Sequence, residues 1–328
     1  MNVLTDTGPR VHLRPAVATP LHRADRLSEE LGIDLWFKRD DMTGVALGGN
    51  KVRVLEYLLG EALAAGADVI VTGAGPASNW AMLAAVAART CGLDTELVYY
   101  GDERSAPNLE LARWIGAGVR FTGDDDRQSV DRELVRLADD LRAAGRTPFV
   151  IPRGGATATG CLGYLHMVEE LQTQAFGEGI RIDEVWLPVG SCGTAAGIVA
   201  GVSHHDTGWR VTGVATSRSA DESRARIAEL AGAALARVGS GSEVVDFGVT
   251  GDFLGPGYGV TSAAGTAAAE RVARAEGVLL DPVFGAKAMA GLLAAAEAGT
   301  VTGTVVHLIS GGAPTFLGDL MTTTLASR

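Results

Sequence analysis

Short apolar segments that end near glycine alternate along this chain with longer segments that favour helices. The apolar segments are nearly continuous runs of Val, Ile, Leu and aromatic residues, without an alternation that would separate a polar face from an apolar one. Such runs are typical of parallel strands that are buried on both faces. The predicted strands lie at residues 68–73, 95–101, 148–154, 184–190, 210–216 and 304–311.

The segments between the predicted strands are rich in Ala, Leu, Glu and Arg, which are good helix formers. Predicted helices cover residues 54–65, 79–91, 132–144, 266–275 and 287–298. Strands that alternate with helices indicate an α/β fold with mostly parallel sheets flanked by helices. Because one sheet holding every strand of a 328-residue chain would be unusual, we expect two α/β domains with a cleft between them.

Charge and composition narrow the possible partners. Asp and Glu total 39 against 28 Lys and Arg, which gives a formal charge of −11 and argues against a nucleic-acid or anionic-membrane surface. The three cysteines are too few and too scattered for a disulfide framework or a zinc cluster. No apolar run reaches the ~18–20 residues of a membrane span, and residues 1–15 carry no apolar stretch of signal-peptide length. We therefore expect a cytoplasmic protein with a small-molecule ligand and no metal.

Two further features have simple structural interpretations. The polar stretch at 123–127 (GDDDR) is predicted to be a solvated loop. His307 falls within a predicted buried strand, and we expect a core histidine whose ring nitrogens have hydrogen-bond partners.

Glycine is in excess, at 44 of 328 residues, and three glycine-marked loops could carry chemistry. In the first, Lys51 follows Gly48, Gly49 and Asn50 at the start of a helical segment. A positive charge is disfavoured near a helix N-terminus, which lowers the pKa of the amine. A nucleophilic or imine-forming lysine needs such a shift. A surface lysine on a turn is the simpler alternative.

The other two loops each connect a strand to a helix. The second, at 73–80, contains Ser78 and Asn79, which could cap the helix or could bind a carboxylate or a ring oxygen. The third, at 190–197 (GSCGTAAG), offers small residues and helix N–H groups, as a phosphate cradle does. It matches neither a Walker A loop nor a dinucleotide fingerprint. Tight packing is the alternative explanation for its glycines.

An activated lysine and a phosphate cradle without a nucleotide motif together indicate pyridoxal phosphate (PLP). This cofactor needs a lysine for its imine, a phosphate site and a partner for its ring nitrogen.

The motifs KRDDMTG at 38–44, GGNKVR at 48–53 and LE at 55–56 resemble the D-cysteine desulfhydrase / 1-aminocyclopropane-1-carboxylate (ACC) deaminase family. The resemblance covers nearly the whole chain. Its further matches are TPL at 19–21, SN at 78–79, IP at 151–152, GG at 154–155, glycines at 160 and 163 with the tyrosine at 164, GYGV at 257–260, LDPV at 280–283, KAM at 287–289 and SGG at 310–312.

The resemblance implies PLP enzymes of the tryptophan synthase β-like fold (fold type II). Residues 1–52 and 166–328 would form the large PLP-binding domain and residues 53–165 the small domain, and the protein would be a homodimer. Lys51 would carry PLP as an imine, with Ser78 and Tyr258 as further catalytic residues. The cofactor-binding residues would be Lys51, Asn79, Gly190, Ser191, Cys192, Gly193, Thr194 and Ser310. The substrate-binding residues would be Ser78, Asn79, Trp80, Tyr258 and Phe284.

Two departures from the family pattern bear on the substrate. The family usually has Gln before Ser-Asn and His or Gln after it, whereas this chain has Ala77 and Trp80. ACC deaminases follow Asp-Pro-Val with Tyr-Glu, whereas this chain has Phe284 and Gly285. The ring-opening hydroxyl and the carboxylate that would keep the cofactor's ring nitrogen protonated are both missing, which favours β-elimination of a good leaving group. The altered second loop favours a larger or less polar sulfur-linked amino acid than D-cysteine.

The sequence therefore predicts a PLP-dependent carbon–sulfur lyase of the D-cysteine desulfhydrase type. It would eliminate a sulfur substituent from an amino acid to give pyruvate, ammonia and a thiol or sulfide. ACC deaminase is the main alternative. Further alternatives are a related enzyme with an altered substrate in secondary metabolism, a protein of this fold that binds an amino acid without turnover, and an α/β nucleotide-binding protein.

Overall fold

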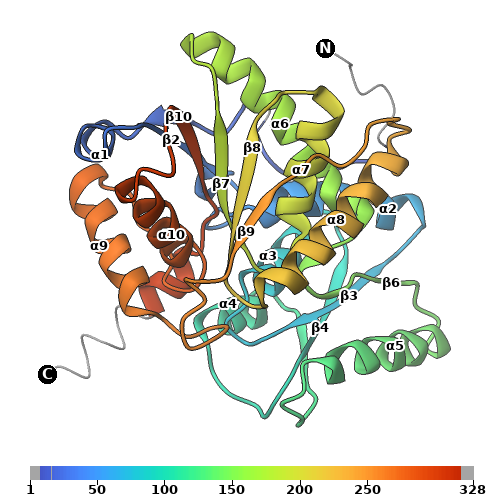
Figure 1. The fold of residues 1–328 in the computed structure, drawn as a ribbon. Coiled ribbons are helices and arrows are strands. Elements are labelled where there is room, and N and C mark those ends of the chain that lie inside the picture. The colour runs from blue at the N-terminus through green and yellow to red at the C-terminus, as the bar shows by residue number, and fades with distance from the viewer. Residues whose placement is uncertain (1–7, 16, 319–328) are drawn as a thin grey trace, which may run out of the picture.

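The computed structural model describes residues 8–15 and 17–318, and these residues contain two β-sheets flanked by helices. Figure 1 shows β3, β4 and β6 with helix α5 in the lower part of the view and β7, β8 and β10 above them. The larger sheet has the order β1-β2-β10-β7-β8-β9, and the smaller sheet has the order β5-β4-β3-β6. All paired strands run parallel except β1 and β2.

The larger sheet uses both ends of the chain. Its strands are β1 (Leu21–Arg23), β2 (Asp34–Arg39), β7 (Glu184–Val189), β8 (Arg210–Ala215), β9 (Gly248–Thr250) and β10 (Thr304–Ile309). The helices that accompany them are α1 (Asp25–Leu31), α7 (Gly193–His205), α8 (Ala220–Arg237), α9 (Ala263–Glu276) and α10 (Gly285–Glu297).

The smaller sheet comes from one continuous stretch of sequence. Its strands are β3 (Val69–Ala74), β4 (Asp94–Tyr99), β5 (Gly118–Phe121) and β6 (Pro148–Val150), with helices α3 (Asn79–Thr90), α4 (Pro107–Trp114) and α5 (Gln128–Ala143). Helices α2 (Lys51–Ala64) and α6 (Ala158–Glu178) pack against each other where the chain passes between the sheets. Two short 3-10 turns, η1 (Asp40–Met42) and η2 (Arg153–Gly155), complete the elements.

The predicted α/β fold with mostly parallel sheets is confirmed, and each predicted strand and helix overlaps an observed one. The strand predicted at 148–154 is shorter, because it ends at Val150 before Pro152 and the turn η2. The predicted domain boundaries at 52/53 and 165/166 fall inside α2 and α6. We retain them as a proposal in which each sheet defines one domain.

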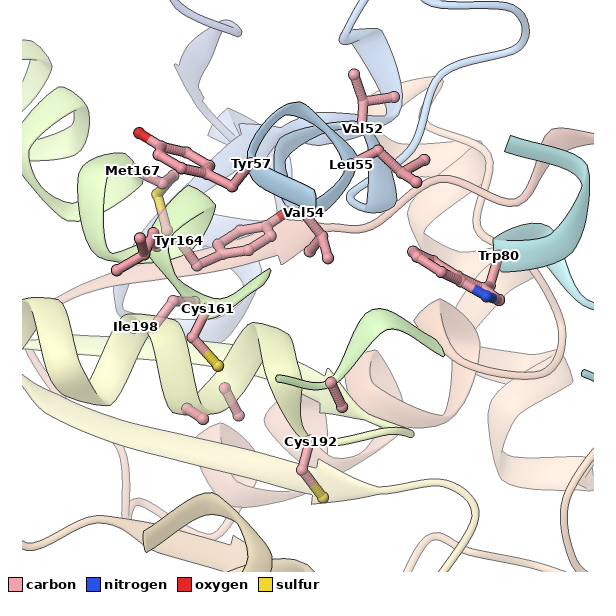
Figure 2. Close-up of a cluster of buried hydrophobic side chains, with 14 of the residues drawn as sticks. Val52, Val54, Leu55, Tyr57, Trp80, Cys161, Tyr164, Met167, Cys192 and Ile198 are labelled. Carbon is pink, nitrogen blue, oxygen red and sulfur yellow. The ribbon is translucent and has the colours of Figure 1, made fainter. Parts of the chain in front are cut away.

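The largest apolar core joins α2, α3, α6 and α7. Figure 2 shows Val54, Tyr57 and Tyr164 between α2 and α6, with Trp80 at the far end of the cluster. Glycines allow α7 to approach α6 closely: a Cβ at Gly197 would lie 2.4 Å from the carbonyl oxygen of Cys161. The packing explanation therefore holds for this glycine of the third loop.

His307 is fully buried in β10, as predicted, but the prediction that its ring nitrogens are bonded is wrong. Neither nitrogen has a hydrogen-bond partner among the described residues. Burial lowers its pKa to about 3, so the ring stays neutral and cannot serve as a base at neutral pH.

Buried charges form a network beneath the first turn of α2. Arg53 donates from Nε and Nη2 to Asp40 over 2.8 and 2.9 Å, and from Nη1 and Nη2 to Glu170 over 2.8 Å each. Lys38 donates to Glu170, while Tyr164 and Thr19 donate to Asp40. Although burial alone would raise both carboxyl pKa values, Arg53 lowers the pKa of Asp40 and of Glu170 to about 2.

We predict that Asp40→Asn costs about 3 kcal/mol of unfolding free energy, because it removes one of the two carboxylates that pair with the buried Arg53 and leaves Glu170 as the other. Asp139→Asn is the matched control, since Asp139 makes an exposed ion pair with Arg142, and should change the unfolding free energy by less than about 0.5 kcal/mol. Denaturant titration followed by circular dichroism measures both. Equal midpoints for the two variants would show that the network does not stabilise the fold.

The same network predicts an acid limit of stability. Folded-state pKa values near 2, below the ordinary values of 3.8 and 4.5, stabilise the fold fully above about pH 4.5. That stabilisation is lost as the pH falls from about 4.5 toward 2. Stability measured across this range should decline in the wild type and decline less steeply in the Asp40→Asn variant.

Candidate active site

A cavity of about 400 Å³ lies where the carboxyl ends of strands from both sheets face each other. Ligands of open α/β sheets bind at such strand ends. Segments that follow strands of both sheets line the cavity. From the smaller sheet these are Gly75 and Ser78 after β3, Tyr100 after β4, Arg127 after β5, and Pro152 and Gly154 after β6. From the larger sheet they are Gly190 to Cys192 after β7, and Ser217 with Arg218 after β8. Ser310 follows β10 and Lys51 begins α2.

Lys51 is the first residue of α2, as predicted, and its amine reaches into the cavity. Its Nζ donates to Ser191 Oγ over 3.3 Å. Burial lowers the pKa of Lys51 to about 8, and the nearby thiols of Cys192 and Cys161 offset this only in part. A substantial fraction of the amine is therefore neutral near physiological pH, as a nucleophile or a base requires.

The third loop presents a helix N-terminus to the cavity. Gly190, Ser191, Cys192 and Thr194 line it, and Gly193 is the first residue of α7. First-turn N–H groups have no partner within their own helix and so can bind an anion. Asn50 Nδ2 donates to Thr194 Oγ1 over 3.0 Å, which ties this loop to the residue before Lys51.

Cys192 adopts a left-handed backbone, with φ of 73°. Glycine takes this conformation without cost, whereas a residue with a Cβ is strained by about 1–2 kcal/mol. The thiol is buried, and burial raises its pKa, so it stays protonated. A neutral thiol offers no charge to an anion, so it stays our prediction that the backbone N–H groups of the loop bind the phosphate.

Ser78 and Asn79 lie at the start of α3 with side chains available to a ligand. Ser78 holds the N-cap position, but its hydroxyl makes no capping bond to the described chain, so the capping explanation is wrong for it. Asn79 Oδ1 accepts bonds from Asn108 Nδ2 over 3.0 Å and from Thr315 Oγ1 over 3.4 Å. This arrangement leaves Asn79 Nδ2 as a donor beside Gly312.

The aromatic residues of the predicted substrate region are also at the cavity. Tyr258 and Phe284 both line the cavity, and their rings meet edge to face with 5.9 Å between the ring centres. Phe284 packs over Gly190, where a Cβ would lie 2.9 Å from its ring. Buried Asp281 fixes this turn by accepting the N–H groups of residues 283, 284 and 285.

The two departures from the family pattern in the second loop, Trp80 and Ala77, affect the cavity differently. Trp80 lines the cavity, but the ring is buried and its Nε1 donates to Thr72 Oγ1 over 3.0 Å. Ala77 is exposed and is not among the residues that line the cavity. The lost polar side chain at position 77 therefore gives no reason to expect a less polar pocket.

Several lining residues were missed in the sequence, above all the arginines at 127, 153, 218 and 226. The stretch 123–127 is an exposed loop, as predicted, but its last residue, Arg127, also reaches the cavity. Spacing alone could not find these residues, because they come from four separate segments. An arginine soon after a strand end (Arg218) or at a helix start (Arg127) was the available signal.

Comparisons with known proteins identify the family. The model of the pyridoxal-phosphate dependent enzyme family matches residues 14–311. D-cysteine desulfhydrase of Yersinia pestis (strain Pestoides F) is 36% identical over 308 residues, which are 90% of this chain and 92% of that protein. A Pyrococcus abyssi protein provisionally named as an ACC deaminase is 35% identical over 314 residues, 96% of this chain and 94% of that protein.

A solved structure agrees with these relatives. The crystal structure of an ACC deaminase homologue has a TM-score of 0.91 at 33% identity and covers 98% of this chain and 97% of its own. The fold is therefore the predicted fold type II. The chain belongs to the family of pyridoxal-phosphate-dependent enzymes, and its relatives include both D-cysteine desulfhydrases and ACC deaminases.

The cavity fits PLP. It combines an amine of lowered pKa at Lys51, a helix N-terminus at Gly193 and a donor at Asn79. Ser310 supplies a neutral hydroxyl near the start of α2, since its carbonyl oxygen accepts the N–H of Asn50. The individual roles predicted for these residues stay predictions.

We predict that imine formation between the apoprotein and added PLP accelerates about tenfold from pH 6 to pH 7 and levels off above about pH 8, because only the neutral Lys51 amine reacts. The rate of appearance of the visible band measures this. A free lysine derivative should keep accelerating toward its pKa near 10.4. Lys51→Ala should give no borohydride-reducible linkage. A wild-type rate that climbs steadily to pH 10 would contradict the lowered pKa.

We also predict that Cys192→Gly keeps PLP affinity within about twofold and raises the unfolding free energy by about 1 kcal/mol, because it relieves the positive φ. Cys192→Ala is the matched control, since it removes the thiol but keeps the strain. Equilibrium titration with PLP and denaturant unfolding provide the two measurements. Loss of PLP in both variants would show that the thiol contributes to binding.

Proposed function

We propose that this protein is a PLP-dependent lyase of the D-cysteine desulfhydrase type, which eliminates a sulfur-linked β-substituent from an amino acid. The observation that carries the proposal is the Lys51 amine, with its pKa near 8, in a cavity that also holds the Ser78 hydroxyl and the N-terminus of α7. The relatives named as D-cysteine desulfhydrases support it.

In this proposal different residues of the cavity bind the cofactor and the substrate. Lys51, Asn79, Ser310 and the N–H groups at residues 193–195 would hold the cofactor. When bound, PLP withdraws electrons from the substrate's Cα. Ser78 would bind the substrate carboxylate, next to the N-terminus of α3.

Lys51 would act as the base that takes the proton from Cα. Its lowered pKa leaves the amine neutral often enough to accept that proton near neutral pH. Tyr258 has the opposite tendency, because burial raises its pKa to about 12. Its hydroxyl therefore stays protonated and can donate to the substrate or to the departing sulfur, but it does not serve as the base.

ACC deamination is the alternative reaction, because other relatives are named for it. The geometry at Phe284 and Gly285 favours elimination. The Phe284 ring carries no hydroxyl where it meets the cavity. Gly285 has no side chain, so position 285 offers no carboxylate to the ring nitrogen. The position is also buried, and a Cβ there would lie 3.0 Å from Asp281 Oδ2.

We predict pyruvate release from at least one sulfur-linked amino acid, and ACC turnover that is lower by about 10²–10⁴-fold, because the hydroxyl that would assist proton transfer is absent. The assay compares ACC, D- and L-cysteine and S-alkyl cysteines of both configurations. It measures 2-oxobutanoate from ACC and pyruvate from the other substrates. Formation of 2-oxobutanoate at a rate that matches or exceeds the best pyruvate rate would overturn the assignment.

We further propose that the enzyme works as a cytoplasmic homodimer on a small amino acid. Within the described residues no helix is long and apolar enough to cross a membrane. The net charge of −11 also disfavours nucleic acid as a ligand.

A further inference from the structure

Arg127 lines the cavity beside Tyr258, on the side where the substrate is proposed to bind. It is the last residue of the exposed loop at 123–127 and the N-cap of α5. Its guanidinium carbon lies 4.5 Å from the ring centre of Tyr258 and 6.0 Å from that of Tyr100. The Tyr100 hydroxyl adjoins Gly75, in the loop that carries Ser78, since a Cβ at Gly75 would lie 2.9 Å from it.

The other arginines at the cavity are already engaged. Arg153 makes a two-pronged ion pair with Asp131, over 2.9 and 2.7 Å. Arg218 donates to the carbonyl oxygen of Gly190, in the loop before α7. Arg226 pairs with Glu229 over 2.7 Å and donates to the carbonyl oxygen of Ala156.

Arg127 differs from these three. Among the described residues no carboxylate lies within ion-pair distance of its guanidinium, and no acceptor takes a hydrogen bond from it, although three aspartates precede it in sequence. A cation at a helix N-terminus is electrostatically unfavourable. The two tyrosines nevertheless hold the side chain at the cavity, with its N–H donors free for a planar anion.

We propose that Arg127 binds an anionic group at the end of the substrate's sulfur substituent. This proposal rests on the elimination reaction proposed above and narrows its substrate class to S-substituted cysteines whose substituent carries a carboxylate. Tyr258 would fix the guanidinium from one side, while Ser78 and the start of α3 bind the amino-acid carboxylate. Arg127 is then a specificity-determining residue.

The reaction balances without a further reactant except water. The Cα–H and Cβ–S bonds break and a Cα–Cβ double bond forms. The proton goes to Lys51, and the electron pair leaves with sulfur as the thiolate of a mercaptocarboxylate. Hydrolysis of the released 2-aminoacrylate gives pyruvate and ammonia. Arg127 would hold the far end of the leaving group and take no part in bond breaking.

The test compares S-carboxymethylcysteine with S-carbamoylmethylcysteine, its neutral isostere of nearly the same shape, in both configurations. The PLP-loaded wild type should turn over the carboxymethyl compound with a kcat/KM about tenfold higher, because the carboxylate pairs with the guanidinium. Arg127→Gln should abolish this preference with little change toward the neutral compound. Arg127→Lys should keep part of it.

Arg132→Gln is the matched control. Arg132 also lies on the N-terminal part of α5, but it is 64% exposed and faces Asp124 and Asp126 rather than the cavity. This variant should keep the wild-type preference. Equal kcat/KM for the two compounds in the wild type would overturn the proposal. An equal loss toward both compounds in Arg127→Gln would also overturn it, since that would place Arg127 on the amino-acid carboxylate.

A binding readout separates this proposal from the proposed reaction. Shifts of the visible cofactor band report the affinity of each compound without turnover. If no compound releases pyruvate but the carboxymethyl compound binds more tightly in an Arg127-dependent way, elimination fails and anion recognition stands. If pyruvate forms readily and the binding shows no Arg127-dependent preference, elimination stands and anion recognition fails.

Discussion

The bidentate contact between Arg53 and Asp40 supports the rest of the active site. Arg53 lies two residues after Lys51 on α2, while Asp40 follows strand β2 and Glu170 comes from α6. One guanidinium thereby fixes the first turn of α2 against two other elements. The segment 38–53 thus contains both a buried charged support and the lysine whose amine reaches the cavity. The support holds the helix turn from which that amine projects.

The sequence predicted the architecture well because buried parallel strands have a distinctive composition. The runs at 184–189 and 304–309 are mostly apolar, and both are central strands of the larger sheet. Short or partly exposed elements carried weaker signals. Four of the described strands were not predicted: β1, β2, β5 and β9. β1 and β9 have three residues each, β5 has an exposed arginine, and the apolar run of β2 is flanked by charged residues. Their pairing depends on neighbours distant in sequence, which local composition does not report.

The site was predictable where residues cluster in sequence and not where the fold alone assembles them. Lys51, Ser78 and the loop before α7 were found because each lies beside a strand end or a helix start with small neighbours. Arg127 was assigned to a solvated loop, since three aspartates precede it in sequence and nothing local distinguishes it. Its stacking on Tyr258 joins residues from separate segments. Similarly, the unbonded nitrogens of His307 follow from tertiary packing and not from its strand.

The position of β10 between β2 and β7 has a consequence for the order of assembly. β2 pairs with β10 along its whole length, from Asp34 opposite Thr304 to Arg39 opposite Ile309. These strands are separated by most of the polypeptide, whereas the smaller sheet forms from one continuous stretch. Contacts between distant segments carry a larger loop-closure cost and form later than local ones. During synthesis the smaller sheet can form early, but the larger sheet stays split until its last strand leaves the ribosome. Ser310, whose carbonyl oxygen accepts the N–H of Asn50, directly follows that strand, so the nascent chain completes this side of the cavity only after β10 has left the ribosome.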